Sequence, residues 1–298
     1  MADAEMMLQM TGKAGFIAAL DQSGGSTPGA LRLYGIADSD YGSEEEMFRL
    51  MHEMRVRIMT APAFSGDKVI GAILFEKTMD GEARGKAVPS FLWEERGVVP
   101  FLKVDKGLAA EENGVQVMKP MPDLDALLDR AVKKGIFGTK MRSVIANADR
   151  TGIAAVVKQQ FAIGRQILGY GLVPIIEPEV SIKSPTKQEA EAILLDEITR
   201  ELDALPSGER VMIKLTIPTV ADIYKPLIDH KSVARVVALS GGYSRADACE
   251  KLSHNHGMIA SFSRALTEDL RVTMSDAEFD SSLARTIDQI YTASATKI

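Results

Sequence analysis

The chain has 298 residues, of which 46% are hydrophobic and 26% are charged, and its net charge at pH 7 is −6. This is the composition of an ordinary globular protein, and its longest apolar runs are too short to cross a bilayer. Basic residues do not cluster with aromatic ones, so we expect no nucleic-acid partner and no membrane partner. The single cysteine, Cys249, excludes an internal disulfide framework. The acidic start of the chain does not follow the pattern of a signal peptide, and we therefore expect a cytoplasmic protein.

Eight short apolar runs alternate with longer amphipathic segments along the chain. They cover residues 16–20, 69–75, 98–103, 137–144, 172–176, 211–213, 233–239 and 257–262. Runs this apolar are typical of parallel strands that are covered on both faces. Helix signals lie between them: a capping box at Ser43 and Glu46, a helix over 123–134 ended by Gly135, one over 150–168, and one over 186–205 that follows Ser184-Pro185.

Eight strands that alternate with helices predict an α/β protein of the (β/α)8 TIM barrel class. The alternative is an open doubly wound sheet, but the first strand is not followed by Gly-x-Gly-x-x-Gly, and no Gly-Lys-Ser/Thr phosphate loop occurs. Neither a linker nor a repeat divides the chain. We therefore predict a single barrel domain over 1–298, with a C-terminal tail from about residue 270.

Polar residues follow the apolar runs, where a barrel of this class builds its active site. In strand order these are Asp21, Ser23 and Ser26, then Lys103, Lys140 and Arg142, Glu177 and Glu179, Lys214, Ser240-Gly241-Gly242, and finally Ser261 and Arg264. Two lysines, several acids and an arginine that converge on one mouth are more polar than a barrel core requires. The sequence therefore predicts a reactive site there.

The residue types in this set indicate chemistry on a carbonyl. A buried lysine is costly, and Lys214 is explained if its neutral amine attacks a carbonyl, although a lysine that simply reaches solvent is the commoner case. The charge of Lys140 nearby would favour that neutral amine, and Glu177 and Asp21 can transfer protons. The hydroxyl and backbone N–H groups of Ser240-Gly241-Gly242 form an anion nest, to which Arg264 can add a bidentate contact.

Ser23, Ser26 and Lys103 can form a second anion site across the mouth. Two phosphate sites that flank an amine suggest a bisphosphorylated ketose as the substrate. With these residues the chain resembles the class I fructose-bisphosphate aldolase family, of the shorter bacterial kind, from about residue 15 to about 266. The most specific blocks are Lys103-Val-Asp-Lys-Gly107 and Pro174-Ile-Ile-Glu-Pro-Glu179.

The resemblance implies a role for each residue. Lys214 would form the Schiff base, Glu177 would be the acid and base of imine formation with Glu179 and Lys140 beside it, and Asp21 would deprotonate the C4 hydroxyl. One phosphate would bind at Ser240, Gly241 and Arg264, and the other near Ser23, Ser26 and Lys103 with support from Arg142. The protein would be a glycolytic and gluconeogenic lyase without a cofactor or metal. It would take a small sugar phosphate as its substrate and form a homo-oligomer.

Several positions depart from the pattern of the animal family members. Gln22 replaces an acidic residue, Ala30 stands where a phosphate-contacting arginine is found, and Phe262-Ser263 replaces Tyr-Gly. Arg32 is an open candidate to replace the arginine. Tyr291 is a weak candidate to replace the terminal tyrosine that transfers a proton in animal enzymes.

Two other functions stay open at this point. The first is a Schiff-base aldolase or transaldolase that acts on another sugar phosphate, and the second is a barrel without activity that serves as a scaffold. His254 and His256 could be read as metal ligands, but acidic ligands do not accompany them, and a metal site is not expected.

Overall fold

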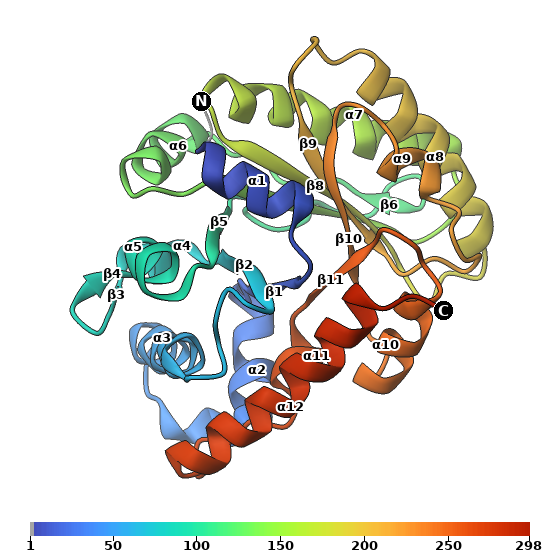
Figure 1. Ribbon diagram of the computed structural model, residues 1–298. Coiled ribbons are helices and arrows are strands. Elements are labelled where there is room, and N and C mark those ends of the chain that lie inside the picture. The colour runs from blue at the N-terminus through green and yellow to red at the C-terminus, as the bar shows by residue number, and fades with distance from the viewer. Residues whose placement is uncertain (1–2) are drawn as a thin grey trace.

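The computed structural model describes residues 3–298 and contains the predicted barrel (Figure 1). Its eight parallel strands are β1 (Phe16–Leu20), β2 (Val69–Leu74), β5 (Val99–Lys103), β7 (Gly138–Ile145), β8 (Val173–Val180), β9 (Val211–Thr216), β10 (Val233–Leu239) and β11 (Ile259–Phe262). Neighbours pair in the order β5-β2-β1-β11-β10-β9-β8-β7, and pairing between β5 and β7 closes the ring. The fold class predicted from the alternating pattern is confirmed.

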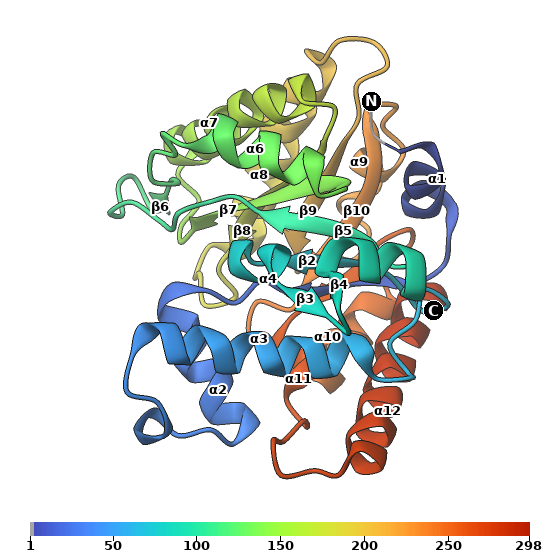
Figure 2. The same cartoon turned by 90° about the vertical axis from the view of Figure 1, so that its left-hand side faces the viewer.

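Helices cover the outside of the strands (Figures 1 and 2). They are α2 (Thr27–Tyr34), α3 (Glu44–Thr60), α4 (Glu76–Asp80), α5 (Val88–Ser90), α6 (Leu124–Lys133), α7 (Arg150–Gly169), α8 (Lys187–Asp203), α9 (Lys225–Ile228), α10 (Arg245–Ser253), α11 (Arg264–Thr267) and α12 (Asp276–Ala295). A short hairpin of β3 (Glu82–Ala83) and β4 (Lys86–Ala87) lies beside α3, and β6 (Val115–Gln116) pairs antiparallel with the end of β7.

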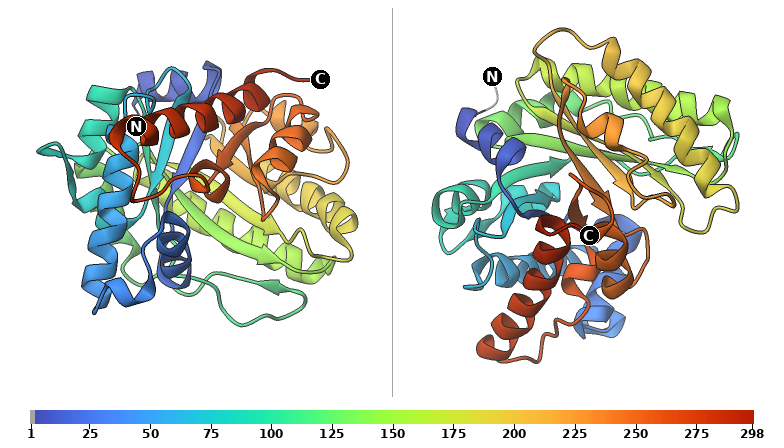
Figure 3. Two further views of the ribbon diagram at one scale, coloured as in Figure 1. Left: turned by 90° about the horizontal axis from the view of Figure 1, so that it is seen from below. Right: turned by 45° about the vertical axis from the view of Figure 1, so that its right-hand side comes forward.

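The helix starts follow the sequence signals. Ser43 Oγ accepts a hydrogen bond from the backbone N of Glu46 at 3.1 Å, so the cap predicted for α3 is present. The helices predicted over 123–134, 150–168 and 186–205 correspond to α6, α7 and α8, with ends that differ by two residues at most. Helix α12 packs against α10 and α11, where Figure 3 shows it lying across the outside of the barrel. The division into a barrel and a tail from about 270 stays a prediction.

Helix α1 (Ala4–Gly12), which the sequence analysis did not predict, closes the N-terminal end of the barrel. Its Met6 and Met10 belong to the same apolar cluster as the side chains that fill the barrel interior. Gln9 Nε2 donates hydrogen bonds to the carbonyl oxygens of Ile70 at 2.8 Å and Gly97 at 2.7 Å, which fastens the helix across the strand starts. The opposite, C-terminal end is therefore the end that can admit a substrate.

None of the helices within residues 3–298 is both long enough and apolar enough to cross a membrane.

Candidate active site

The polar residues of the mouth continue the inward-facing rows of the strands. The interior apolar cluster contains Ile17 and Ala19 of β1, Val99 and Phe101 of β5, Val173 and Ile175 of β8, Met212 of β9, and Ile259 of β11. Side chains alternate between the two faces of a strand, so the next inward position in each row lies two residues further on. Those positions are Asp21, Lys103, Glu177, Lys214 and Ser261. Strands β8 and β9 extend to Val180 and Thr216, further than predicted, so Glu177 and Lys214 lie within strands and not after them.

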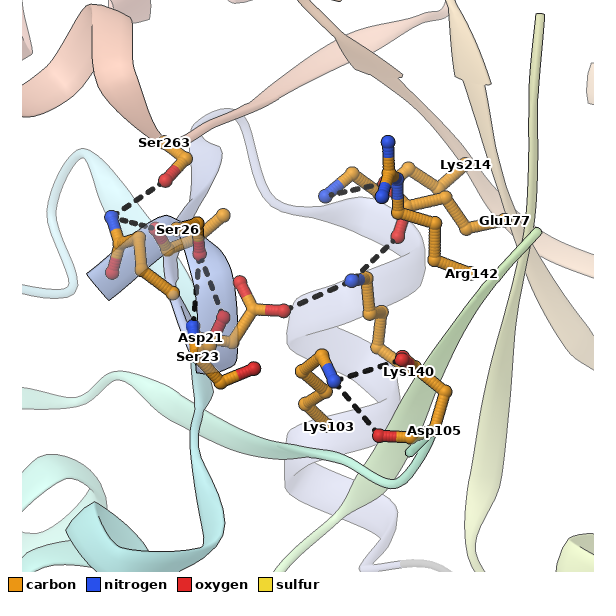
Figure 4. Close-up of polar contacts among 12 residues, drawn as sticks. Asp21, Ser23, Ser26, Lys103, Asp105, Lys140, Arg142, Glu177, Lys214 and Ser263 are labelled. Carbon is orange, nitrogen blue, oxygen red and sulfur yellow. Dashed lines mark hydrogen bonds and ion pairs between the residues drawn. The ribbon is translucent and has the colours of Figure 1, made fainter. Parts of the chain in front are cut away.

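Four buried charged side chains form one continuous chain (Figure 4). Lys140 Nζ lies 2.9 Å from Asp21 Oδ2 and 2.9 Å from Glu177 Oε2. Glu177 Oε1 lies 3.1 Å from Lys214 Nζ. All four residues are less than a tenth exposed. The structure therefore brings together four of the five residues to which the resemblance assigned catalytic roles, and the fifth, Glu179, pairs with Arg142.

The charges of this chain hold Asp21 and Lys140 in their ionised forms. Burial raises the pKa of Asp21, but the nearby charges of Lys140 and Lys214 lower it by more, to about 2. Burial lowers the pKa of Lys140, but Asp21 and Glu177 raise it by more, to well above the ordinary range of lysine. At neutral pH, Asp21 is a carboxylate and Lys140 is an ammonium group.

Gln160 of α7 supports the strand that carries Glu177, and the sequence analysis did not identify it. Its Oε1 accepts a hydrogen bond from the backbone N of Glu177 at 2.8 Å, and its Nε2 donates to Ser143 Oγ at 3.0 Å. Gln160 is fully buried beside Phe161 on the inner face of α7. An amide among the apolar positions of a helix face was the signal that could have revealed it.

Two further basic residues of the mouth are paired with acids. Lys103 Nζ lies 2.8 Å from Asp105 Oδ1 and also donates to the backbone carbonyl of Asp105. Arg142 Nε donates to the carboxylate of Glu179. Burial lowers the pKa of Arg142, but Glu179, Glu177 and Asp105 together raise it by more. Glu179 therefore pairs with Arg142. It lies two residues after Glu177 in β8.

The loop after β10 is rich in glycine and lies beside Arg264, the first residue of α11. Gly241 and Gly242 have φ angles of +62° and +118°, a backbone that favours glycine. A Cβ on Gly241 would lie 2.7 Å from Ile182 Cγ2, and one on Gly242 would lie 3.4 Å from Arg264 Nη2. Arg264 has no acidic partner and Ser261 Oγ no hydrogen-bond partner within residues 3–298. Unsatisfied donors of this kind around one loop are what an anion site requires.

The other predicted anion site is less assembled. Ser26 Oγ donates to the carbonyl of Ser23 at 2.9 Å and accepts from its backbone N at 3.1 Å, so the two serines bond to each other and not to Lys103. Arg32 is exposed and forms an ion pair with Asp38 at 2.7 Å. Arg32 was the open candidate to replace the arginine that is missing at Ala30, and in the structure it is paired with Asp38.

The weaker candidates lie away from the mouth. Lys68 Nζ, which precedes β2 at the N-terminal end of the barrel, lies 5.9 Å from the ring centre of Tyr291. His254 Nε2 lies 3.1 Å from Glu250 Oε1, and His256 Nδ1 lies 2.8 Å from Asp222 Oδ2. Between residues 3 and 298, no three His, Cys, Asp or Glu side chains are grouped so that they could hold a metal ion.

Comparisons with known proteins identify the family of the chain. A family model described as fructose-bisphosphate aldolase class-I matches residues 4–201. The chain is 56% identical over 292 residues to the fructose-bisphosphate aldolase class 1 of Synechocystis, covering 98% of this chain and 97% of that protein. It is 57% identical over 290 residues to the enzyme of the same name from Porphyromonas gingivalis, covering 97% of this chain and 98% of that protein.

A solved structure shares the fold at low sequence identity. It is the fructose-bisphosphate aldolase of Plasmodium falciparum, determined in complex with TRAP and a small-molecule inhibitor. It aligns with 100% of this chain and 97% of its own, with a TM-score of 0.74 and 20% identity. From the family match and the two relatives of more than 55% identity, the chain belongs to the class I fructose-bisphosphate aldolase family.

Proposed function

We propose that this barrel mouth performs the reversible cleavage of fructose 1,6-bisphosphate to dihydroxyacetone phosphate and glyceraldehyde 3-phosphate, with Lys214 as the nucleophile. The observation that carries the assignment is the buried contact of 3.1 Å between Lys214 Nζ and Glu177 Oε1. An amine attacks a carbonyl only when it has lost its proton, and a carboxylate in direct contact can take that proton.

The contacts distinguish Lys214 from Lys140, although both are buried. Lys140 lies between two carboxylates, those of Asp21 and Glu177, which raise its pKa. Among the acidic side chains of residues 3–298, Lys214 pairs with Glu177 alone, and the other oxygen of that carboxylate already faces Lys140. Lys140 is thus held as a permanent cation, and Lys214 is the amine that can react with the substrate carbonyl.

The reaction follows from this arrangement. Lys214 attacks the ketose C2, Glu177 transfers the protons that let water leave, and the resulting iminium withdraws electrons from the C3–C4 bond. Asp21 takes the proton of the C4 hydroxyl, the C4 carbonyl forms, and the electron pair of the broken bond moves to C3 as the enamine. The low pKa of Asp21 keeps it ionised and ready to accept this proton. Protonation of the enamine and hydrolysis then release dihydroxyacetone phosphate.

The two phosphates would bind on either side of this chain of charges. One phosphate stays on dihydroxyacetone phosphate after cleavage. We assign it to a set of donors with free bonding capacity: Ser240, the N–H groups of Gly241 and Gly242, Ser261 and Arg264. We assign the second phosphate to Ser23, Ser26 and Lys103, with Arg142 nearby. Substrate must then compete with Asp105 for Lys103 and with Glu179 for Arg142. A homo-oligomer and a cytoplasmic location also remain predictions.

Borohydride trapping tests the nucleophile. Incubation with dihydroxyacetone phosphate and borohydride should produce a stable adduct on Lys214, located by peptide mass spectrometry, and Lys214→Met should give none. Lys140→Met serves as the comparison, because it removes the other buried lysine and should leave the adduct on Lys214. An adduct on Lys140 in the wild-type enzyme would reverse the two assignments.

A further inference from the structure

Gln22, the residue after Asp21, is held from two directions. Its side-chain Nε2 donates a hydrogen bond of 2.6 Å to Ser263 Oγ, and Ser263 directly precedes Arg264. Its backbone carbonyl accepts a hydrogen bond from the guanidinium group of Arg55. The end of β1, which carries the proposed base, is therefore tied both to the start of α11, whose first residue is Arg264, and to helix α3.

Arg55 is an unusual residue to find at this place. It is 1% exposed, and within residues 3–298 it makes no ion pair with a carboxylate. Besides Gln22 it contacts Thr78 Oγ1 at 2.8 Å and lies 5.8 Å from the ring centre of Phe75. Burial lowers the pKa of Arg55 to about 10, and the charge of Asp21 acts in the opposite direction.

A buried guanidinium without a paired carboxylate is costly, so a simple packing role does not explain it. Its five N–H donors in a rigid fork are suited to fixing a backbone carbonyl, and here that carbonyl belongs to the residue that follows Asp21. Asp21 in turn must keep its carboxylate 2.9 Å from Lys140 Nζ. By holding the backbone next to Asp21, Arg55 therefore fixes the position of the Asp21 carboxylate.

We propose that Arg55, Gln22 and Ser263 form a positioning clamp, which holds Asp21 in place relative to the start of α11 for the carbon–carbon cleavage step. The clamp contacts neither Lys214 nor Glu177. The inference rests on the proposed function, since it assigns to Asp21 the removal of the C4 hydroxyl proton. Dihydroxyacetone phosphate lacks a C4 hydroxyl, so its iminium forms without Asp21.

This difference separates the clamp from a general structural role. Gln22→Leu removes the donor and Ser263→Ala removes the acceptor of the same hydrogen bond. Each should slow cleavage of fructose 1,6-bisphosphate at saturating substrate by roughly 10- to 100-fold, as expected when a reacting group is misplaced by a fraction of its working distance. Each should leave the rate of borohydride trapping with saturating dihydroxyacetone phosphate within about twofold of wild type.

The double variant tests whether the two residues act as one unit. If the hydrogen bond carries the effect, Gln22→Leu with Ser263→Ala should be no slower than the slower single variant. Arg55→Met should show the same split between cleavage and trapping, and Arg55→Lys should recover part of the cleavage rate because it keeps a donor for the carbonyl. Ser281→Ala, an exposed serine on α12, is the matched control and should match wild type in both assays.

The results separate two failures. Equal losses in cleavage and trapping, or unchanged cleavage in Gln22→Leu and Ser263→Ala, would overturn the clamp alone. A wild-type enzyme that neither cleaves fructose 1,6-bisphosphate nor forms an adduct would overturn the proposed function, and the clamp with it.

Discussion

Replacing Lys140 with methionine removes the cation between the carboxylates of Asp21 and Glu177. Both carboxylates lie 2.9 Å from Lys140 Nζ, and they are 7% and 3% exposed. Methionine fills a similar volume, so the variant keeps the packing and loses the charge. The two carboxylates would then remain buried, and Glu177 would keep its contact with Lys214.

The expected cost can be estimated from the pKa of Asp21. That pKa is about 2, against an ordinary value of 3.8, because the charges of Lys140 and Lys214 outweigh the effect of burial. The difference corresponds to about 2.5 kcal/mol of stabilisation at neutral pH. Because the folded pKa is depressed, this stabilisation is present above about pH 4 and is lost as the pH falls towards 2. Removal of one partner of a buried ion pair typically costs about 3–5 kcal/mol, and we expect Lys140→Met to fall in that range at pH 7.

The variant should also respond to pH differently from the wild type. Burial raises the pKa of Asp21, and Lys140 is the charge that lowers it most. Without Lys140 the pKa of Asp21 therefore rises, and its carboxyl group takes up a proton at a higher pH. A buried neutral carboxyl group does not require a cation beside it. The difference in unfolding free energy between wild type and Lys140→Met should therefore become smaller as the pH is lowered from 7 to 5.

Urea denaturation at both pH values measures the deficit, and loss of fructose 1,6-bisphosphate cleavage should accompany it. Lys68→Met is the control, because its partner Asp288 is 59% exposed and the pair should contribute about 0–1 kcal/mol. If Lys140→Met unfolds within about 1 kcal/mol of wild type at pH 7, or its deficit is the same at pH 5, Lys140 does not hold these charges.

Two more predictions concern the phosphate sites, and one concerns the absence of a metal requirement. Arg264→Ala should lower kcat/KM about 10- to 150-fold for both fructose 1,6-bisphosphate and fructose 1-phosphate, whereas Lys103→Met should do so only for the bisphosphate; equal damage to both substrates by Lys103→Met would place Lys103 in the chemistry. Gly241→Ala puts a Cβ at φ +62° and 2.7 Å from Ile182, so it should raise the KM and cost about 1–3 kcal/mol in thermal unfolding, and an unchanged KM would count against the loop as the phosphate site. EDTA should leave the cleavage rate unchanged because the iminium is the electron sink, and a loss restored by zinc would contradict this mechanism.

The strands and the charged residues above them could be predicted because both follow from short patterns in the sequence. Apolar runs mark the strands, and the fixed alternation of side chains places Asp21, Glu177 and Lys214 above the interior rows. The ends of β8 and β9 were predicted too early, because Glu177 and Lys214 are polar and the apolar pattern stops before them. Helix α1 escaped prediction because only Met6 and Met10 of its residues are buried, which gives almost no periodic signal.

Contacts between distant residues could not be predicted from patterns. Gln22 and Ser263 were noticed separately as departures from the animal sequences, and they are 241 positions apart in the chain, yet their side chains are hydrogen-bonded. Arg55 looks like one of several charges on an ordinary amphipathic helix, between Glu53 and Arg57, and only its position against the end of β1 reveals that it is buried. Which charges of a helix are buried depends on what packs against it, and a single sequence does not contain that information.

The charge balance of the site explains why four charged groups are placed together in a barrel interior. In the proposed iminium state Asp21 and Glu177 are negative, while Lys140 and the iminium of Lys214 are positive, so the four groups sum to zero. When the C3–C4 bond breaks, Asp21 becomes neutral by accepting the C4 hydroxyl proton, and the iminium becomes a neutral enamine by accepting the electron pair. The remaining pair, Lys140 and Glu177, still sums to zero at a separation of 2.9 Å. Cleavage thus proceeds without creating an unpaired buried charge, which would cost several kcal/mol in this environment. In the proposed mechanism, the chain of alternating charges would therefore lower the barrier by keeping the buried net charge constant during the step.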